Sequence, residues 1–172
     1  MFDVKKTLRL MMKSRGFSFR ELAEKYNELI GTEYTESAMM YKINHEKIKA
    51  TEMQVICDII GFEFWLINRE TKQKAMVIPL KETLKRLFES KGMSQDAVRR
   101  EYCDRTGDTI GQTGFSTKVM REIMRVTELQ VVADILNYDV VIINPDTGLE
   151  FNEQGDKPVK IGDISWYGVD WN

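Results

Sequence analysis

The sequence has few of the side chains on which metal sites, disulfide frameworks and acid–base catalysis depend. The chain of 172 residues contains two cysteines and one histidine. Cys57 lies in an apolar run and Cys103 in a charged stretch, so neither a disulfide framework nor a metal site is indicated. A lone histidine such as His45 is far more often a surface residue than a catalytic base. We therefore expect no catalytic residues, no metal, no cofactor and no enzymatic activity.

Long hydrophobic runs are also missing. No stretch approaches the roughly 18 consecutive apolar residues that a membrane-spanning helix needs, although 42% of the residues are hydrophobic and 30% are charged. The N-terminal residues 1–6 lead directly into an amphipathic pattern, without the separate apolar segment of a secretory signal. These absences predict a globular protein of the cytoplasm with no membrane partner.

What the sequence does contain is an internal repeat. A shift of 76 positions aligns residues 4–71 with residues 80–147 without a gap, and 19 of the 68 aligned pairs are identical. Such self-similarity predicts successive copies of one structural unit. Many identities fall where a helix is expected to start or stop: Gly16/Gly92, Ser18/Ser94, Gly31/Gly107, Thr51/Thr127, Glu52/Glu128 and Gln54/Gln130. We expect a first module over residues 1–76, a second over residues 77–152 and an acidic, aromatic tail over residues 153–172.

The first two helices of each module are predicted from spacing and caps. Apolar residues recur at helical spacing and end at Gly16 or Gly92, which suit a left-handed C-terminal cap. Ser18 and Ser94 then offer side-chain oxygens to the free amides of a second helix. This second helix should run to about residue 30 in the first module and to about residue 106 in the second.

The third and fourth helices follow after a polar link. An apolar pair four residues apart predicts a short third helix that is otherwise polar: Met39 with Ile43, and Phe115 with Val119. Capping boxes that begin at Thr51 and Thr127 predict a fourth helix. This helix should end at Gly61 or Asn137, the residue types that best tolerate a positive φ.

Two short segments rich in β-branched and aromatic residues follow the predicted fourth helices. Residues 62–67 and 138–143 are too short for a helix of this apolarity, and each predicts a strand. Residues 74–79 and 149–152 are placed to return against them as hairpins. The expected fold is therefore mostly α with short β-hairpins, a tandem repeat of a four-helix module that is each time followed by a hairpin.

A Ser-capped second helix followed by a short polar third helix resembles the lambda-repressor-like helix-turn-helix domain, the type found in phage repressors and xenobiotic-response-element regulators. The resemblance covers roughly residues 4–68 and 80–144. In the first module it depends on Leu8 and on residues 16–25, 37–44 and 51–62, and in the second on residues 92–98, 113–120 and 127–138.

The resemblance implies that the third helix of each module enters the major groove of double-stranded DNA. Its early solvent-facing side chains are then expected to meet base edges: Glu36, Ser37, Met40 and Tyr41, and Gln112, Thr113, Ser116 and Thr117. Basic and polar side chains around it are expected to contact phosphates: Lys42, Lys47, Lys49, Gln95, Lys118, Arg121 and Arg125. The implied function is sequence-specific transcriptional regulation, of phage or mobile-element origin.

The alternative is a protein-interaction module that kept the fold without DNA binding, such as an inhibitor, antirepressor or DNA-mimicking factor, and the acidic second half, Arg99 and the aromatic tail favour it. Three features of the sequence depart from the family's pattern. The links at residues 26–34 and 102–110 leave room for more residues than the family's turn of three or four. Arg99 occupies the position at which Ala23 supplies the small residue that tight helix packing wants. The formal net charge is −2, whereas DNA-binding domains are usually basic.

The two modules also suggest how a single chain could imitate a repressor dimer. If their hairpin strands pair into one sheet, the two third helices can point at successive major grooves. Such a site is expected to be imperfectly symmetric, because Glu36 and Ser37 differ from Gln112 and Thr113. A protein partner at the second module or at the tail, where Trp166, Tyr167 and Trp171 lie, and a homodimer remain further possibilities.

Overall fold

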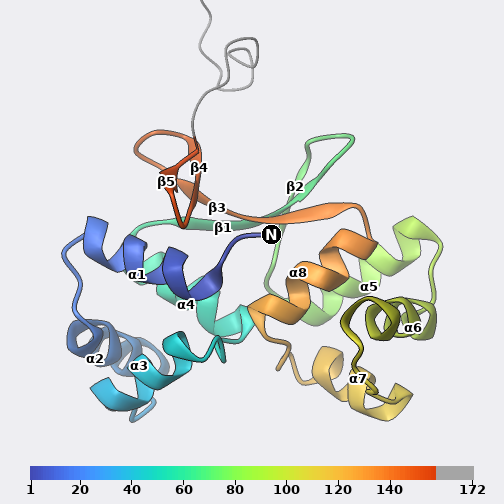
Figure 1. The fold of residues 1–172 in the computed structure, drawn as a ribbon, viewed down its shortest axis with the longest axis horizontal. Coiled ribbons are helices and arrows are strands. Elements are labelled where there is room, and N and C mark those ends of the chain that lie inside the picture. The colour runs from blue at the N-terminus through green and yellow to red at the C-terminus, as the bar shows by residue number, and fades with distance from the viewer. Residues whose placement is uncertain (158–172) are drawn as a thin grey trace, which may run out of the picture.

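The computed structural model describes residues 1–157, which form a mostly helical protein with a small antiparallel sheet (Figure 1). The first half contains α1 (Val4–Ser14), α2 (Phe19–Ile30), α3 (Glu36–Asn44), α4 (Ala50–Ile60), β1 (Glu63–Asn68) and β2 (Lys74–Met76). The second half contains α5 (Leu80–Lys91), α6 (Gln95–Thr106), α7 (Gln112–Met120), α8 (Val126–Ile135), β3 (Tyr138–Asn144), β4 (Leu149–Asn152) and β5 (Gly155–Asp156). The expected mostly-α fold with short hairpins is confirmed.

None of the helices within residues 1–157 is long and apolar enough to cross a membrane. The aromatic residues of the predicted tail, Trp166, Tyr167 and Trp171, lie outside the described residues. Strand β5 lies at the start of that predicted tail and pairs with β4 through Phe151 opposite Asp156.

The caps that begin the second helices agree with the sequence pattern. The Ser18 hydroxyl accepts a hydrogen bond from the Glu21 amide at 3.1 Å, and the Glu21 carboxylate accepts one from the Ser18 amide at 3.4 Å. Ser94 accepts from the Ala97 amide in the same way, at 3.1 Å. Because these bonds satisfy amides that have no partner within the helix, they fix where α2 and α6 begin.

The fourth helix of each half begins slightly earlier in the sequence than predicted. Helix α4 begins at Ala50 and α8 at Val126, one residue before the threonines that were expected to cap them. The Glu52 carboxylate accepts from the Lys49 amide at 3.2 Å, and the Glu128 carboxylate accepts from the Arg125 amide at 2.8 Å. The acidic half of a capping box is therefore present without a Ser or Thr partner.

The five strands form one antiparallel sheet in the order β2-β1-β3-β4-β5. The central pair, β1 with β3, comes from the two halves of the chain, and its register centres on Trp65 opposite Val141. These two residues are 76 positions apart, so the shift that aligns the sequence also relates the paired strands. The pairing is therefore symmetric about Trp65 and Val141.

A second contact on the same line of symmetry joins the helical layers. Lys49 pairs with Arg125 in an isolated antiparallel bridge, and these residues are also 76 positions apart. The Ala50 amide donates to the Met124 carbonyl at 2.9 Å, and the Val126 amide donates to the Ile48 carbonyl at 3.0 Å. Together, the sheet and the bridge fix the orientation of one half against the other.

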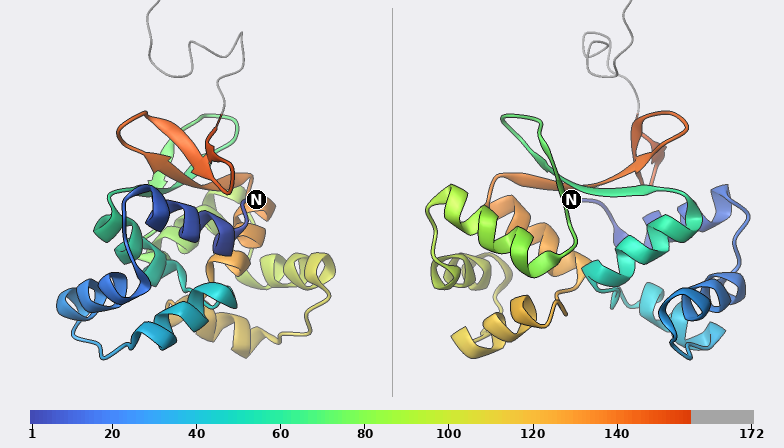
Figure 2. Two further views of the ribbon diagram at one scale, coloured as in Figure 1. Left: turned by 60° about the vertical axis from the view of Figure 1, so that its left-hand side comes forward. Right: turned by 180° about the vertical axis from the view of Figure 1, so that it is seen from behind.

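The helices cover one face of the sheet (Figures 1 and 2). Phe64, Leu66, Val140 and Ile142 belong to the main core, which also contains buried side chains of the helices. The alternate residues of β1 and β3, which include Trp65 and Val141, form a separate small cluster. This alternation follows from the two-residue period of a strand.

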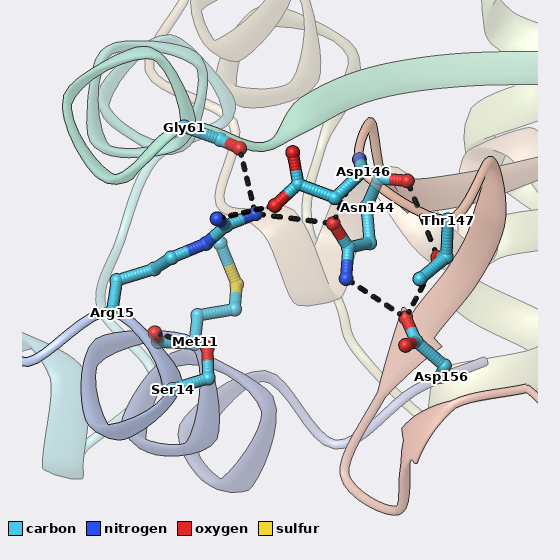
Figure 3. A network of polar contacts seen from close by, with 8 residues as sticks. All are labelled: Met11, Ser14, Arg15, Gly61, Asn144, Asp146, Thr147 and Asp156. Carbon is cyan, nitrogen blue, oxygen red and sulfur yellow. Dashed lines mark hydrogen bonds and ion pairs between the residues drawn. The ribbon is translucent and has the colours of Figure 1, made fainter.

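Each hairpin is bonded to helices of the other half of the chain. Arg15, at the end of α1, donates to Asp146 at 2.6 Å and to Asn144 at 3.1 Å (Figure 3). At the other hairpin, Arg69 forms ion pairs with Asp134 of α8 and Asp139 of β3. Neither half therefore completes its polar contacts by itself.

We expect Leu66→Ala to lower the free energy of unfolding of the whole chain by about 2–5 kcal/mol, because Leu66 is fully buried in the strand that joins the halves. Urea denaturation followed by circular dichroism checks this. Met76→Ala is the matched control, since Met76 is 63% exposed. Two separate unfolding transitions, of which only one shifts, would contradict the interdependence of the halves.

Candidate nucleic-acid interface

Helices α3 and α7 lie on the same side of the molecule, the side farthest from the sheet (Figures 1 and 2). The two helices are equivalent in the sequence shift, since Glu36 and Gln112 begin them and are 76 positions apart. The sequence analysis placed its base-facing residues on these helices. The side chains that each helix exposes therefore decide what this face can bind.

Helix α3 buries one narrow stripe and exposes the rest. Met39 and Ile43 are fully buried, which agrees with the predicted apolar pair. Of the predicted base-facing residues, Glu36 and Ser37 are exposed, Tyr41 is 50% exposed and Met40 is half-buried. Polar and aromatic side chains thus occupy the early, outward side of α3.

Helix α7 begins with small and uncharged side chains. Phe115 and Val119 are buried in the positions of Met39 and Ile43. Gln112 and Thr113 are exposed, whereas Ser116 and Thr117 are half-buried. The Thr117 hydroxyl donates to the Thr113 carbonyl at 2.8 Å, so its donor is already used by the helix backbone.

An open depression of about 550 Å³ lies between α6 and α7. It brings together six of the predicted site residues: Gln95, Gln112, Thr113, Ser116, Thr117 and Arg121. Asp96, Arg99 and Met120 also line it. The lining mixes amide, hydroxyl, guanidinium and carboxylate groups, which are the groups that hydrogen-bond to base edges and phosphates.

Lys42 and Lys118 form ion pairs with carboxylates of the helices that follow them. Lys42 forms an ion pair with Glu52 of α4, and Lys118 forms the equivalent pair with Glu128 of α8. Burial disfavours the charge of Lys42, but hydrogen bonds to Glu52 and to the Tyr34 hydroxyl outweigh it, so the pKa of Lys42 is raised. Both amines already have carboxylate partners, so a phosphate contact from either lysine would compete with an ion pair within the fold.

The other predicted phosphate contacts lie between and beside the two helices. Lys47 donates to the Tyr41 hydroxyl at 2.8 Å and lies 4.7 Å from the centre of its ring. Lys49 and Arg125 meet at the bridge between the halves. Arg121 and Arg125 are exposed. Basic side chains thus accompany α3 and α7 at the middle of this face.

The links that join α2 to α3 and α6 to α7 are shorter than the sequence suggested. Arg99 lies beside the second of them. The links consist of residues 31–35 and 107–111, close to the family's turn of three or four residues. In the first half the side-chain amide of Asn27 donates a hydrogen bond to the backbone carbonyl of Tyr34 at 2.7 Å. In the second half Arg99 donates to the equivalent carbonyl, that of Ile110, at 3.1 Å. Arg99 therefore fastens the link, and it also lines the open depression between α6 and α7.

The sequence pattern alone did not single out Arg20 and Asp96, which are equivalent in the shift of 76 positions. Asp96 accepts a hydrogen bond from Arg99 at 2.7 Å, and this bond, with others, holds the pKa of the Asp96 carboxyl below its usual range. Both residues are the second of their helix, so their distance from the Ser18 and Ser94 caps could have identified them.

Within residues 1–157 no cluster of His, Cys, Asp and Glu could hold a metal ion. Comparison of the chain with protein-family models, with curated proteins and with solved structures finds no match. The function therefore has to be argued from the geometry of this face.

We expect Lys42→Ala to lower the free energy of unfolding by about 2 kcal/mol, because it leaves the Glu52 carboxylate, which is 7% exposed, without its amine partner. Chemical denaturation at neutral pH measures the change. Lys5→Ala, which removes an exposed lysine of α1, serves as the control. Equal stability of Lys42→Ala and Lys5→Ala would show that the pair does not hold α3 to α4.

Proposed function

We propose that the protein is a sequence-specific DNA-binding regulator that works as a single-chain equivalent of a repressor dimer. In this proposal the chain consists of two lambda-repressor-like helix-turn-helix modules, and α3 and α7 enter successive major grooves of one duplex. The observation that carries it is the position of α3 and α7 on one side of the molecule, equivalent in the sequence shift (Figure 1).

Equivalent contacts, both between the halves and within each half, support the two-module proposal. The Trp65–Val141 pair, the Lys49–Arg125 bridge and the Lys42–Glu52 and Lys118–Glu128 ion pairs all follow the same shift of 76 positions. A two-fold arrangement of this kind matches the symmetry of duplex DNA. Dimeric helix-turn-helix proteins bind half-sites about one helical turn apart, roughly 34 Å.

The net charge of −2 does not decide whether the chain binds DNA, because the positions of the exposed cations on this face matter more than their total. The exposed Arg121 and Arg125 lie beside α7. Affinity for phosphates depends on such local cations more than on the net charge of the chain.

The alternative function, a protein-interaction module without DNA binding, is favoured by one observation. Glu36 places an exposed carboxylate at the first position of α3, where it would approach DNA. A carboxylate near phosphates costs affinity unless it meets a base donor or a cation. Retention on duplex DNA therefore separates the two functions.

We expect the protein to bind a mixed-sequence duplex at about 50 mM salt and to lose affinity steeply as salt rises. The combined variant Lys47→Gln, Arg121→Gln and Arg125→Gln should bind more weakly and reduce the salt slope by about 1 for each phosphate contact removed. Fluorescence anisotropy measures both quantities.

The matched control is Lys85→Gln with Arg86→Gln, which removes exposed positive charges from α5. Its affinity and salt slope should stay close to those of the unchanged protein. No binding by the unchanged protein at low salt would rule out the DNA-binding proposal and leave the protein-interaction module.

A further inference from the structure

The sheet has a second face, opposite to the one that the helices cover. Within residues 1–157 no helix lies against this face, which we call the outer face (Figures 1 and 2). It carries the small apolar cluster of Trp65, Ile67, Val141 and Ile143. Met76 of β2 is the partner of Trp65, and partnered residues of neighbouring strands point to the same face. The outer face is therefore apolar across β2, β1 and β3.

Solvent reaches this face mainly at two side chains. Trp65 is half-buried and Met76 is 63% exposed, whereas the other three residues of the cluster are buried. The Trp65 indole N–H donates to the Glu63 carboxylate at 2.8 Å, and the Lys74 amine lies 5.4 Å from the centre of the Trp65 ring. An exposed apolar surface with a polar border is typical of a docking site.

The last described residue lies near this face. Strand β5 is three strands from β1 in the sheet, about 14 Å at the usual strand spacing. The Lys157 amide donates to the Glu150 carbonyl at 2.6 Å, and the Lys157 amine forms an ion pair with the Glu150 carboxylate at 3.5 Å. Glu150 is the partner of Ile143, so its side chain borders the outer face. The chain beyond Lys157 thus starts at the edge of this face.

The sequence of residues 158–172 contains the apolar side chains that such a surface would accept. In residues 164–166, and again in residues 169–171, two apolar residues flank one polar residue. This alternation is typical of an extended segment that buries one side. The second apolar residue of each group is a tryptophan, Trp166 or Trp171, and tryptophan gains most from packing against another aromatic side chain.

The distance to Trp65 is within reach of this segment. Trp166 stands nine positions after Lys157. Nine extended residues span up to about 30 Å, roughly twice the separation of β5 from β1. The segment is therefore long enough to bring the Trp166 indole to the outer face of its own sheet.

We propose that residues 158–172 dock on the outer face of the sheet of the same chain and that Trp166 packs against Trp65. The segment then covers the strands that join the two halves, on the side opposite to the helices. Because α3 and α7 lie on the side of the molecule farthest from the sheet (Figure 1), this docking does not depend on the proposed DNA binding.

The fluorescence of Trp65 in the full chain tests the docking. The chain contains three tryptophans, so replacing Trp166 and Trp171 leaves Trp65 as the only one. The variant Trp166→Phe with Trp171→Phe retains aromatic side chains and should keep Trp65 covered. The matched variant Trp166→Ser with Trp171→Ser should shift the Trp65 emission to longer wavelength and increase its quenching by acrylamide. Circular dichroism should be the same for both, because neither changes a residue within 1–157.

A reciprocal pair of variants changes the outer face instead. Trp65→Phe and Trp65→Ser both leave Trp166 and Trp171 as the fluorescent residues. Their emission should lie at longer wavelength in Trp65→Ser, because the ring against which Trp166 packs is lost. If Trp65→Ser does not fold, the variants at Trp166 and Trp171, which leave the sheet unchanged, still decide the question.

Equal emission and equal quenching of Trp65 in the Phe and Ser variants of the segment would overturn the docking. A difference that appears only at high protein concentration, together with a dimer in analytical ultracentrifugation, would place the segment on the sheet of a second copy and overturn docking within one chain. These measurements contain no DNA, so their failure leaves the DNA-binding proposal standing, and the failure of DNA binding leaves the docking standing.

Discussion

The antiparallel pairing of β1 with β3 is the contact on which the rest of the structure depends. It joins strands from the two halves with Trp65 opposite Val141, and a strand left at an open edge would have unpaired backbone groups. Because the register is symmetric, the helical layers that continue from these strands take symmetric positions. The bridge between Lys49 and Arg125 repeats the constraint closer to α3 and α7. The orientation of α3 and α7 is thus set by backbone hydrogen bonds far from the surface that they expose.

Some of the residues that are identical in the two halves form contacts within the fold. Lys42 and Lys118 are kept in both copies and pair with Glu52 and Glu128, which ties each third helix to the fourth. The exposed first positions of α3 and α7, by contrast, differ in charge. A chain that keeps its internal contacts and varies its outer face can present two different reading surfaces at one fixed geometry. In a dimer of identical chains, the two surfaces would be the same.

Much of the local structure could be predicted from the sequence, because caps and periodicity act over a few residues. The Ser18 cap and the buried Met39–Ile43 pair are examples. The direction of a long side chain could not be predicted in this way: Lys42 appeared free beside helix 3, but its amine reaches a carboxylate on the next helix. The hydrogen bond from Arg99 to the Ile110 carbonyl could not be predicted either, because only the folded link brings that carbonyl near. The depression between α6 and α7 needs tertiary packing and has no local signal.

In the proposed function, one chain aims two helices at one face of a duplex. Hydroxyl-radical footprinting of the full chain on a duplex that it selects measures this most directly. The account predicts two protected patches on the same face of the DNA, about 10 base pairs apart, within one complex of one chain per duplex. A single protected patch, or two patches that require two chains, would contradict it.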